Sequence, residues 1–133
     1  MSYRDQVDFS TLAGKTLKDI NGSEGDECMT FTTVEGEEFI MYYEHDCCAS
    51  CSIEDICGDL NDLIGSPIVQ AEESTSGDNP PDADPETIQY QESFTWTFYR
   101  LATIKGSVVI RWYGSSNGYY SESVSFEKRG QVN

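Results

Sequence analysis

The chain has 133 residues, with 24 acidic residues against 8 basic ones and a formal net charge of −16. This length predicts a single domain over residues 1–133, and a hydrophobic content of 38% with 12% aromatic residues is enough to build a core. The acidic balance argues against direct binding to duplex DNA or to an anionic membrane, because both need a basic surface.

The negative charge is concentrated in one stretch. Residues 19–99 contain no Lys or Arg but hold 20 of the 24 acidic residues, which gives this stretch a net charge of −20. One interpretation is a solvated surface that keeps the protein soluble. The other is a surface that presents carboxylates to a basic partner, as a nucleic-acid mimic does. Alternate carboxylates on a strand are about 6.6 Å apart and phosphates on one DNA strand about 3.4 Å apart, so mimicry needs several interleaved segments.

Targeting signals and cysteines suggest the compartment. The first residues lack the apolar stretch of a secretory signal, and the longest apolar runs, 39–43 and 108–110, are far too short for a membrane span. The five cysteines are an odd number, and without a signal they should be reduced. We therefore expect a cytoplasmic protein.

The first half of the chain predicts short strands and one short helix. Residues 12–20 suggest a turn and a strand, while residues 29–34 and 37–44 alternate around Glu35-Gly36 and predict a hairpin with a two-residue loop. Asp59 is expected to cap a short helix near 59–63 that ends at Gly65. Residues 67–72 are then expected to form a strand.

A long acidic loop is predicted next. Residues 74–93 hold three of the four prolines and no apolar periodicity, which is typical of a mobile loop. Their carboxylates lack the spacing and the central glycine of an EF-hand, so calcium is not expected.

The last forty residues predict three antiparallel strands. Residues 94–104, 107–113 and 119–128 alternate, with turns at Lys105-Gly106 and at 114–118, and indicate a meander. The expected fold class is therefore α+β, mostly antiparallel β-sheet in a meander or sandwich, with one short helix.

The same alternation predicts a face rich in arginine and aromatic side chains. With Lys105-Gly106 as the loop, Arg100 lies directly opposite Arg111, and two arginines in this position repel unless an anion is near. Carboxylates of the acidic half would neutralise them, or they would hold an anionic ligand such as a nucleotide phosphate beside an aromatic platform. The candidate ligand-binding residues are Trp96, Arg100, Arg111, Tyr113 and Tyr119.

The cysteines suggest a second type of site. Cys48-x-x-Cys51 has the spacing of one zinc knuckle, and weak candidate metal ligands are Cys47, Cys48, Cys51 and Cys57, with Cys28 and His45 as further donors. Free thiols are the favoured alternative, so no cofactor is expected. His45 is the only histidine, and on a strand its side chain lies about 6–7 Å from that of Cys47, too far for a nucleophile–base pair. The chain is not expected to be an enzyme.

Two stretches carry a family resemblance. One is His45-Asp-Cys-Cys followed by Ile53-Glu-Asp-Ile, Gly58-Asp-Leu and Asp62-Leu-Ile-Gly; the other combines Thr95 to Gly106 with Ile110 to Val124. Over residues 12–126 they resemble a family of small uncharacterised bacteriophage and prophage proteins, a domain of unknown function. The resemblance implies an accessory protein that acts in the cytoplasm of the host.

These observations lead to one expected function and two alternatives. We expect a phage-type protein that binds and inhibits or redirects a host protein, such as a nucleic-acid-binding defence enzyme, by presenting acidic residues. The expected contact residues are Glu35, Glu37, Glu38, Glu44, Asp46, Glu54, Asp55, Asp59 and Asp62. The alternatives are a protein that binds a small nucleotide-like anion through the arginine-aromatic face, and a zinc-stabilised structural module.

Overall fold

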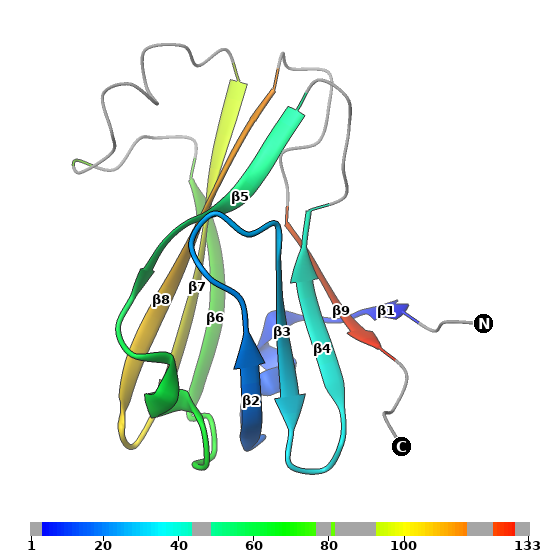
Figure 1. Ribbon diagram of the computed structural model, residues 1–133, viewed down its shortest axis with the longest axis vertical. Coiled ribbons are helices and arrows are strands. Elements are labelled where there is room, and N and C mark those ends of the chain that lie inside the picture. Colours follow the sequence, from blue (N-terminus) through cyan, green and yellow to red (C-terminus); the bar gives the residue numbers. More distant parts are fainter. Residues whose placement is uncertain (1–3, 44–48, 77–80, 82–92, 117–123, 130–133) are drawn as a thin grey trace.

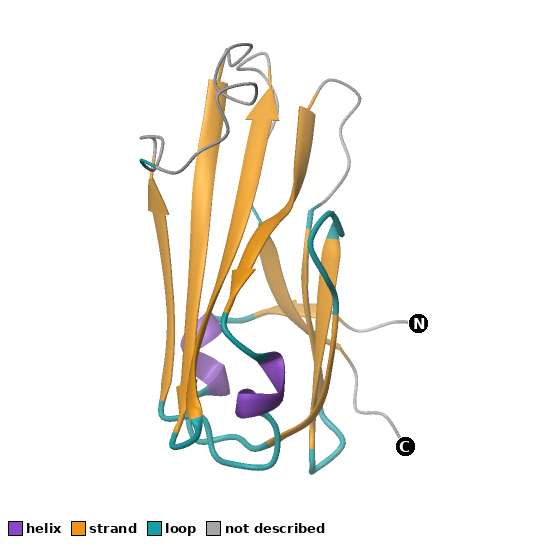
Figure 2. Cartoon of the chain, turned by 60° about the vertical axis from the view of Figure 1, so that its left-hand side comes forward, coloured by secondary structure: helices purple, strands orange, loops and turns teal. Residues whose placement is uncertain are grey.

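Two antiparallel sheets face each other in the computed structural model, which describes residues 4–43, 49–76, 81, 93–116 and 124–129 (Figures 1 and 2). One sheet has five strands in the order β1-β9-β4-β3-β2, and the other has four in the order β5-β8-β7-β6. The prediction of a mostly antiparallel β fold is confirmed, in its sandwich form. Among the described residues no helix is long and apolar enough to cross a membrane.

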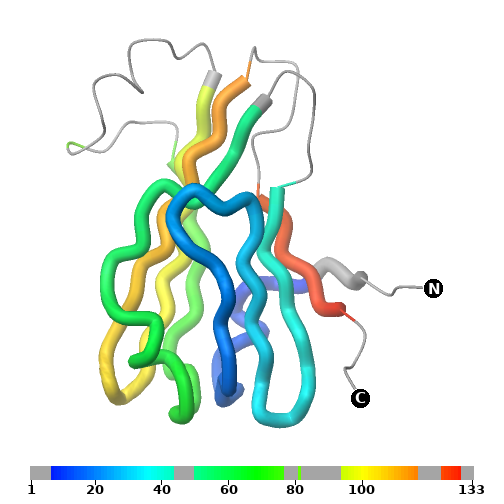
Figure 3. The backbone as a smooth tube through the Cα atoms, in the orientation of Figure 1, coloured from blue at the N-terminus to red at the C-terminus, as the bar shows by residue number. Residues whose placement is uncertain are grey.

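The strands differ in length between the two sheets. The five-stranded sheet is made of short strands: β1 (Arg4–Gln6), β2 (Leu17–Asn21), β3 (Cys28–Thr33), β4 (Glu38–Tyr42) and β9 (Ser125–Arg129). The four-stranded sheet contains the longest strands: β5 (Ala49–Cys57), β6 (Gln70–Ser76), β7 (Ser93–Thr103) and β8 (Gly106–Ser116). The tube view shows the path of the chain between them (Figure 3).

Alternation of apolar residues explains why these segments form strands with one buried face. Along β8, Val108, Ile110 and Trp112 are buried while their neighbours are partly exposed, and β3 alternates in the same way. The buried faces of the two sheets meet in one core. Its inter-sheet contacts include the indole N–H of Trp112, which lies 3.0 Å from the sulfur of Met41 on the opposite sheet.

The predicted short helix is a 3-10 turn. The described residues contain two such turns, η1 (Phe9–Leu12) and η2 (Leu60–Leu63), and no α-helix. The predicted cap is present, because the backbone N–H of Asn61 donates to the Asp59 carboxylate at 2.9 Å. Gly65 follows with a φ of +87°. The N–H of Asp62 donates to the carbonyl of Asp59 and the N–H of Ile64 to that of Asn61, which are the i→i+3 hydrogen bonds of a 3-10 turn.

The prediction of a C-terminal three-stranded meander is wrong for its third strand. β7 and β8 form the predicted hairpin, but β9 pairs with β1 and β4 in the other sheet. The reason is that β5 pairs along the free edge of β8, so β8 has a neighbour on both sides. The chain therefore crosses to the five-stranded sheet, where Phe126 enters the core.

Both predicted hairpin loops differ by one residue from the observed ones: the first is one residue longer and the second is displaced by one residue. The β3–β4 loop has three residues, Val34 to Gly36, and Gly36 takes a φ of +94°, as three-residue loops require at that position. The β7–β8 turn is formed by Ile104 and Lys105 rather than Lys105-Gly106. The register therefore shifts by two residues, which preserves the predicted faces because side chains alternate with a period of two.

The segment between β6 and β7 also starts later than predicted. Ser74 to Ser76 belong to β6 rather than to the acidic loop, and the predicted strand at 67–72 is observed over Gln70–Ser76. The rest of the predicted loop lies mostly at 77–80 and 82–92, outside the described residues.

Gly58 provides a test of the packing between β5 and β8. It has a φ of +113°, and a Cβ there would lie 2.6 Å from the carbonyl oxygen of Ser107, whereas at Gly25 (φ +92°) no atom lies within 4 Å. Both Gly58→Ala and Gly25→Ala carry backbone strain of about 1–2 kcal/mol. We expect Gly58→Ala to lower the free energy of unfolding by about 1–3 kcal/mol more than Gly25→Ala, because only it displaces β8. Urea denaturation followed by circular dichroism measures the difference; equal losses would contradict it.

Candidate functional site

The four described residues of the predicted arginine-aromatic face share the outer face of the four-stranded sheet but do not form an open platform. Trp96 is fully buried there, with the guanidinium of Arg111 5.2 Å above its ring and the ring of Tyr113 4.5 Å away. Tyr119 lies outside the described residues. A ligand therefore cannot stack on Trp96 without displacing these neighbours.

The two arginines have separate surroundings. The observed register places Arg100 opposite Val109 and Arg111 opposite Phe98, which corrects the expected pairing of the two arginines. Arg111 Nη2 binds both carboxylate oxygens of Glu54 at 2.8 and 2.9 Å. Arg100 donates to the Ser74 hydroxyl at 2.9 Å. The neutralisation of Arg111 by the acidic half is thus observed.

Several residues of the expected acidic contact neutralise cations within the fold. Glu37 binds Lys15 at 2.8 Å and Lys128 at 2.9 Å, and Glu38 binds Arg129 at 2.6 Å. The other expected residues are spread over both sheets: Glu35 in the β3–β4 loop, Glu54 and Asp55 on β5, and Asp59 and Asp62 at η2, while Glu44 and Asp46 lie outside the described residues. The structure does not gather the predicted set on one strand or turn.

The candidate zinc ligands are also not brought together among the described residues. Cys51 is buried on β5 and Cys57 is exposed at the end of the same strand. Six residues of strand separate them by about 20 Å, so the two cannot bind one zinc ion. Cys47 and Cys48 lie outside the described residues. Within the described ranges, no group of three His, Cys, Asp or Glu side chains is placed to hold a metal.

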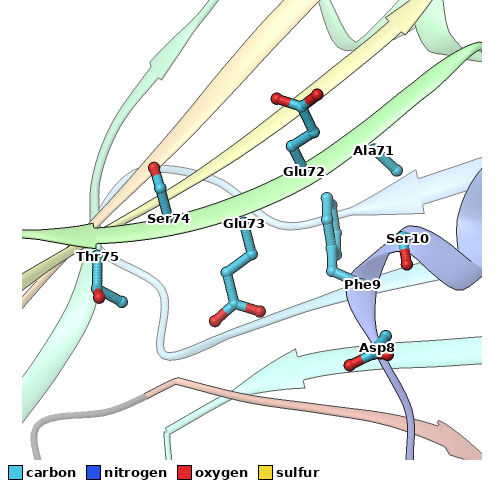
Figure 4. A pocket seen from close by; sticks show the side chains of 8 residues that line it. All are labelled: Asp8, Phe9, Ser10, Ala71, Glu72, Glu73, Ser74 and Thr75. Carbon is cyan, nitrogen blue, oxygen red and sulfur yellow. The ribbon is translucent and has the colours of Figure 1, made fainter.

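A hollow of about 460 Å³ lies between η1 and β6, and we call it the β6 groove (Figure 4). Its lining residues are Asp8, Phe9, Ser10, Ala71, Glu72, Glu73, Ser74 and Thr75. In the close-up, the carboxylate of Glu73 points from β6 to the side where Asp8 lies, and Glu72 points to the opposite side of the strand. Behind the groove, the ring of Phe9 packs 4.6 Å from that of Tyr99.

Three carboxylates make the β6 groove strongly acidic. In the described part of the chain, no Lys or Arg forms an ion pair with Asp8, Glu72 or Glu73. Arg100 lies opposite Glu72 in the β6–β7 ladder, but its guanidinium is bound to Ser74. Partial burial, followed by repulsion from Asp8, raises the pKa of the Glu73 carboxyl. The groove is therefore a place where a cation would relieve an unfavourable charge.

No motif in the sequence indicates the β6 groove as a whole, although the sequence contains one signal for it. Glu72 and Glu73 are consecutive in a strand, so each face of that strand carries a charge. Such a strand is suited to the edge of a sheet. Asp8 comes from the other side of the sandwich through the fold of η1, and no local pattern connects it with Glu73.

Comparison with known proteins shows which family the chain belongs to. A family described as a domain of unknown function (DUF7448) matches residues 10–126. The chain belongs to the DUF7448 family. Within this DUF7448 protein, Glu72 and Glu73 lie inside the matched stretch and Asp8 lies just before it. No curated protein and no solved structure matches the chain.

The carboxyls of Glu73 and Glu37 predict opposite pH dependences. The pKa of Glu73 is raised from its ordinary value of 4.5, so its charge destabilises the folded state as the pH rises above that value. Two lysine hydrogen bonds lower the pKa of Glu37, so its charge stabilises the fold above about pH 4.5, and this contribution is lost as the pH falls through the lowered pKa.

We therefore expect Glu73→Gln to raise the free energy of unfolding at pH 7 and Glu37→Gln to lower it by up to about 1 kcal/mol. The difference for Glu73→Gln should disappear as the pH falls below about 4.5, and that for Glu37→Gln should decrease as the pH falls towards the lowered pKa of Glu37. Urea unfolding at pH 3, 5 and 7 tests this. A loss of stability in Glu73→Gln at pH 7 would contradict the proposed repulsion between Glu73 and Asp8.

Proposed function

We propose that this protein is a non-catalytic binding protein that attaches to a basic surface of a partner protein through the β6 groove. The observation that carries the proposal is the group of three carboxylates around one hollow, with no described Lys or Arg in an ion pair with any of them. A complementary positive surface would steer association and fix the orientation of the partner.

The distribution of the cations supports this assignment. Lys15, Lys128, Arg111 and Arg129 are held in ion pairs by carboxylates of the same chain. The net charge of −16 therefore remains as a large surplus of carboxylates, and those of the β6 groove lie beside a hollow that can receive a side chain. The covered ring of Trp96 and the neutralised Arg111 give less support to an anion-binding function.

The resemblance to bacteriophage and prophage proteins supports a more specific form of the proposal. The protein would act in the host cytoplasm as a phage accessory protein, and its partner would be a host protein that it inhibits or redirects. A nucleic-acid-binding defence enzyme fits this description, because its basic surface is complementary to carboxylates.

The test uses paired charge variants and a partner isolated from host lysate. After identification by mass spectrometry, the partner is titrated by calorimetry with the unmodified protein, with Glu72→Gln/Glu73→Gln, and with the control Asp19→Asn/Glu35→Gln. The control removes the same charge at two exposed positions outside the groove. We expect the groove variant to bind about tenfold more weakly, or about 1.4 kcal/mol, and the control to change little.

Salt provides an independent measurement on the same complex. Affinity should fall as the salt concentration rises, because screening weakens exposed charge interactions. Equal affinities at 50 and 300 mM salt, or an equal loss in the two double variants, would contradict the proposed role of the groove.

A further inference from the structure

β6 forms an open edge of the four-stranded sheet. It pairs with β7 along one side, over Gln70 to Ser76, and the sheet ends there. Among the described residues, no backbone hydrogen bond outside the strand ladders involves residues 70–75. In an antiparallel ladder, alternate residues direct their N–H and C=O groups away from the paired strand. β6 therefore presents a row of backbone donors and acceptors at its free edge.

The β6 groove follows this edge. Successive side chains of a strand point to opposite faces of the sheet, yet all five residues from Ala71 to Thr75 line the same hollow. A hollow that touches five consecutive residues must run along the edge of the strand, where both sets of side chains border it. Residues 8–10 form the other wall (Figure 4). Five strand residues span about 16 Å, which is enough for an extended peptide segment.

We propose that the β6 groove binds an extended segment of the partner as an additional strand beside β6, and that this segment carries two consecutive basic residues. This inference rests on the proposed function and specifies its mode of recognition. Main-chain hydrogen bonds to the free edge provide affinity, and side chains on each face provide specificity. One basic side chain lies opposite Glu72 on the outer face, and the next lies opposite Glu73 on the inner face, near Asp8.

The negative charges of Glu72 and Glu73 at the edge of β6 favour a dibasic segment of the partner over a second copy of the chain. If β6 paired with β6 of another molecule around residues 72–73, four glutamates would meet across the new ladder. Like charges directly opposite each other destabilise strand pairing, and charged edge residues are a common protection against self-association. A dibasic segment converts the same four positions into two pairs of opposite charge.

The experiment varies synthetic peptides and leaves the protein unchanged, so no substitution can impair its folding. The probe is the acetylated and amidated hexapeptide Thr-Val-Lys-Lys-Val-Thr, titrated into the full chain labelled with ¹⁵N and observed by NMR. Two further peptides carry N-methyl groups on alternate amides, one on the odd positions and one on the even positions. A fourth peptide has glutamine in place of both lysines.

We expect the lysine peptide to shift the amide signals of residues 71–75. One of the two N-methylated peptides should bind at least tenfold more weakly while the other binds nearly unchanged, because only one set of peptide N–H groups faces β6. Strand addition is overturned if both N-methylated peptides bind as tightly as the parent, or if residues 71–75 do not shift at millimolar peptide.

The two proposals fail in different ways in this experiment. If the glutamine peptide binds as tightly as the lysine peptide, recognition of positive charge is wrong and the proposed function fails with the inference. If the lysine peptide binds more tightly than the glutamine peptide but N-methylation has no effect, the charge recognition stands and only strand addition is rejected.

Discussion

Aromatic packing around Phe126 connects the two sheets and positions the β6 groove. The ring of Phe126 stacks on Phe39 at 5.7 Å within the five-stranded sheet, and it meets Phe9 of η1 edge-on at 5.1 Å. Phe9 in turn packs against Tyr99 of the four-stranded sheet at 4.6 Å. Because Phe9 lies between the two sheets, this chain of rings fixes η1 beside β6. Asp8 therefore lines the β6 groove because the core holds the adjacent residue, Phe9, in place.

The carboxylates of the protein fall into two groups, which differ in whether the fold places a cation beside them. Where strand pairing brings Lys128 and Arg129 beside β4, Glu37 and Glu38 stabilise the fold by binding them. Where η1 meets β6, no described cation pairs with the carboxylates, and burial raises the pKa of Glu73. Residues of one type thus have two roles, and their local partners rather than their spacing in the sequence determine which role each has.

Local features of the fold could be predicted from the sequence, and distant ones could not. The β3–β4 hairpin (apart from the length of its loop), the Asp59 cap and the two faces of β7 and β8 depend on neighbouring residues and agree with the predictions. The partner of β9 depends on whether β5 occupies the edge of β8, which no pattern within residues 119–128 reveals. The groove joins Asp8 with Glu73 through tertiary packing, so the sequence could indicate the charged strand but not the wall that faces it.

The fluorescence of the two tryptophans can report separately on the two faces of the four-stranded sheet. Trp112 is buried between the sheets against the sulfur of Met41, while Trp96 is buried on the outer face beneath Arg111. Their indoles lie on opposite faces of one sheet, on adjacent strands. Fluorescence of single-tryptophan proteins would therefore follow the loss of inter-sheet packing and the loss of the outer arginine layer separately. Coincident transitions would identify the sandwich as one cooperative unit.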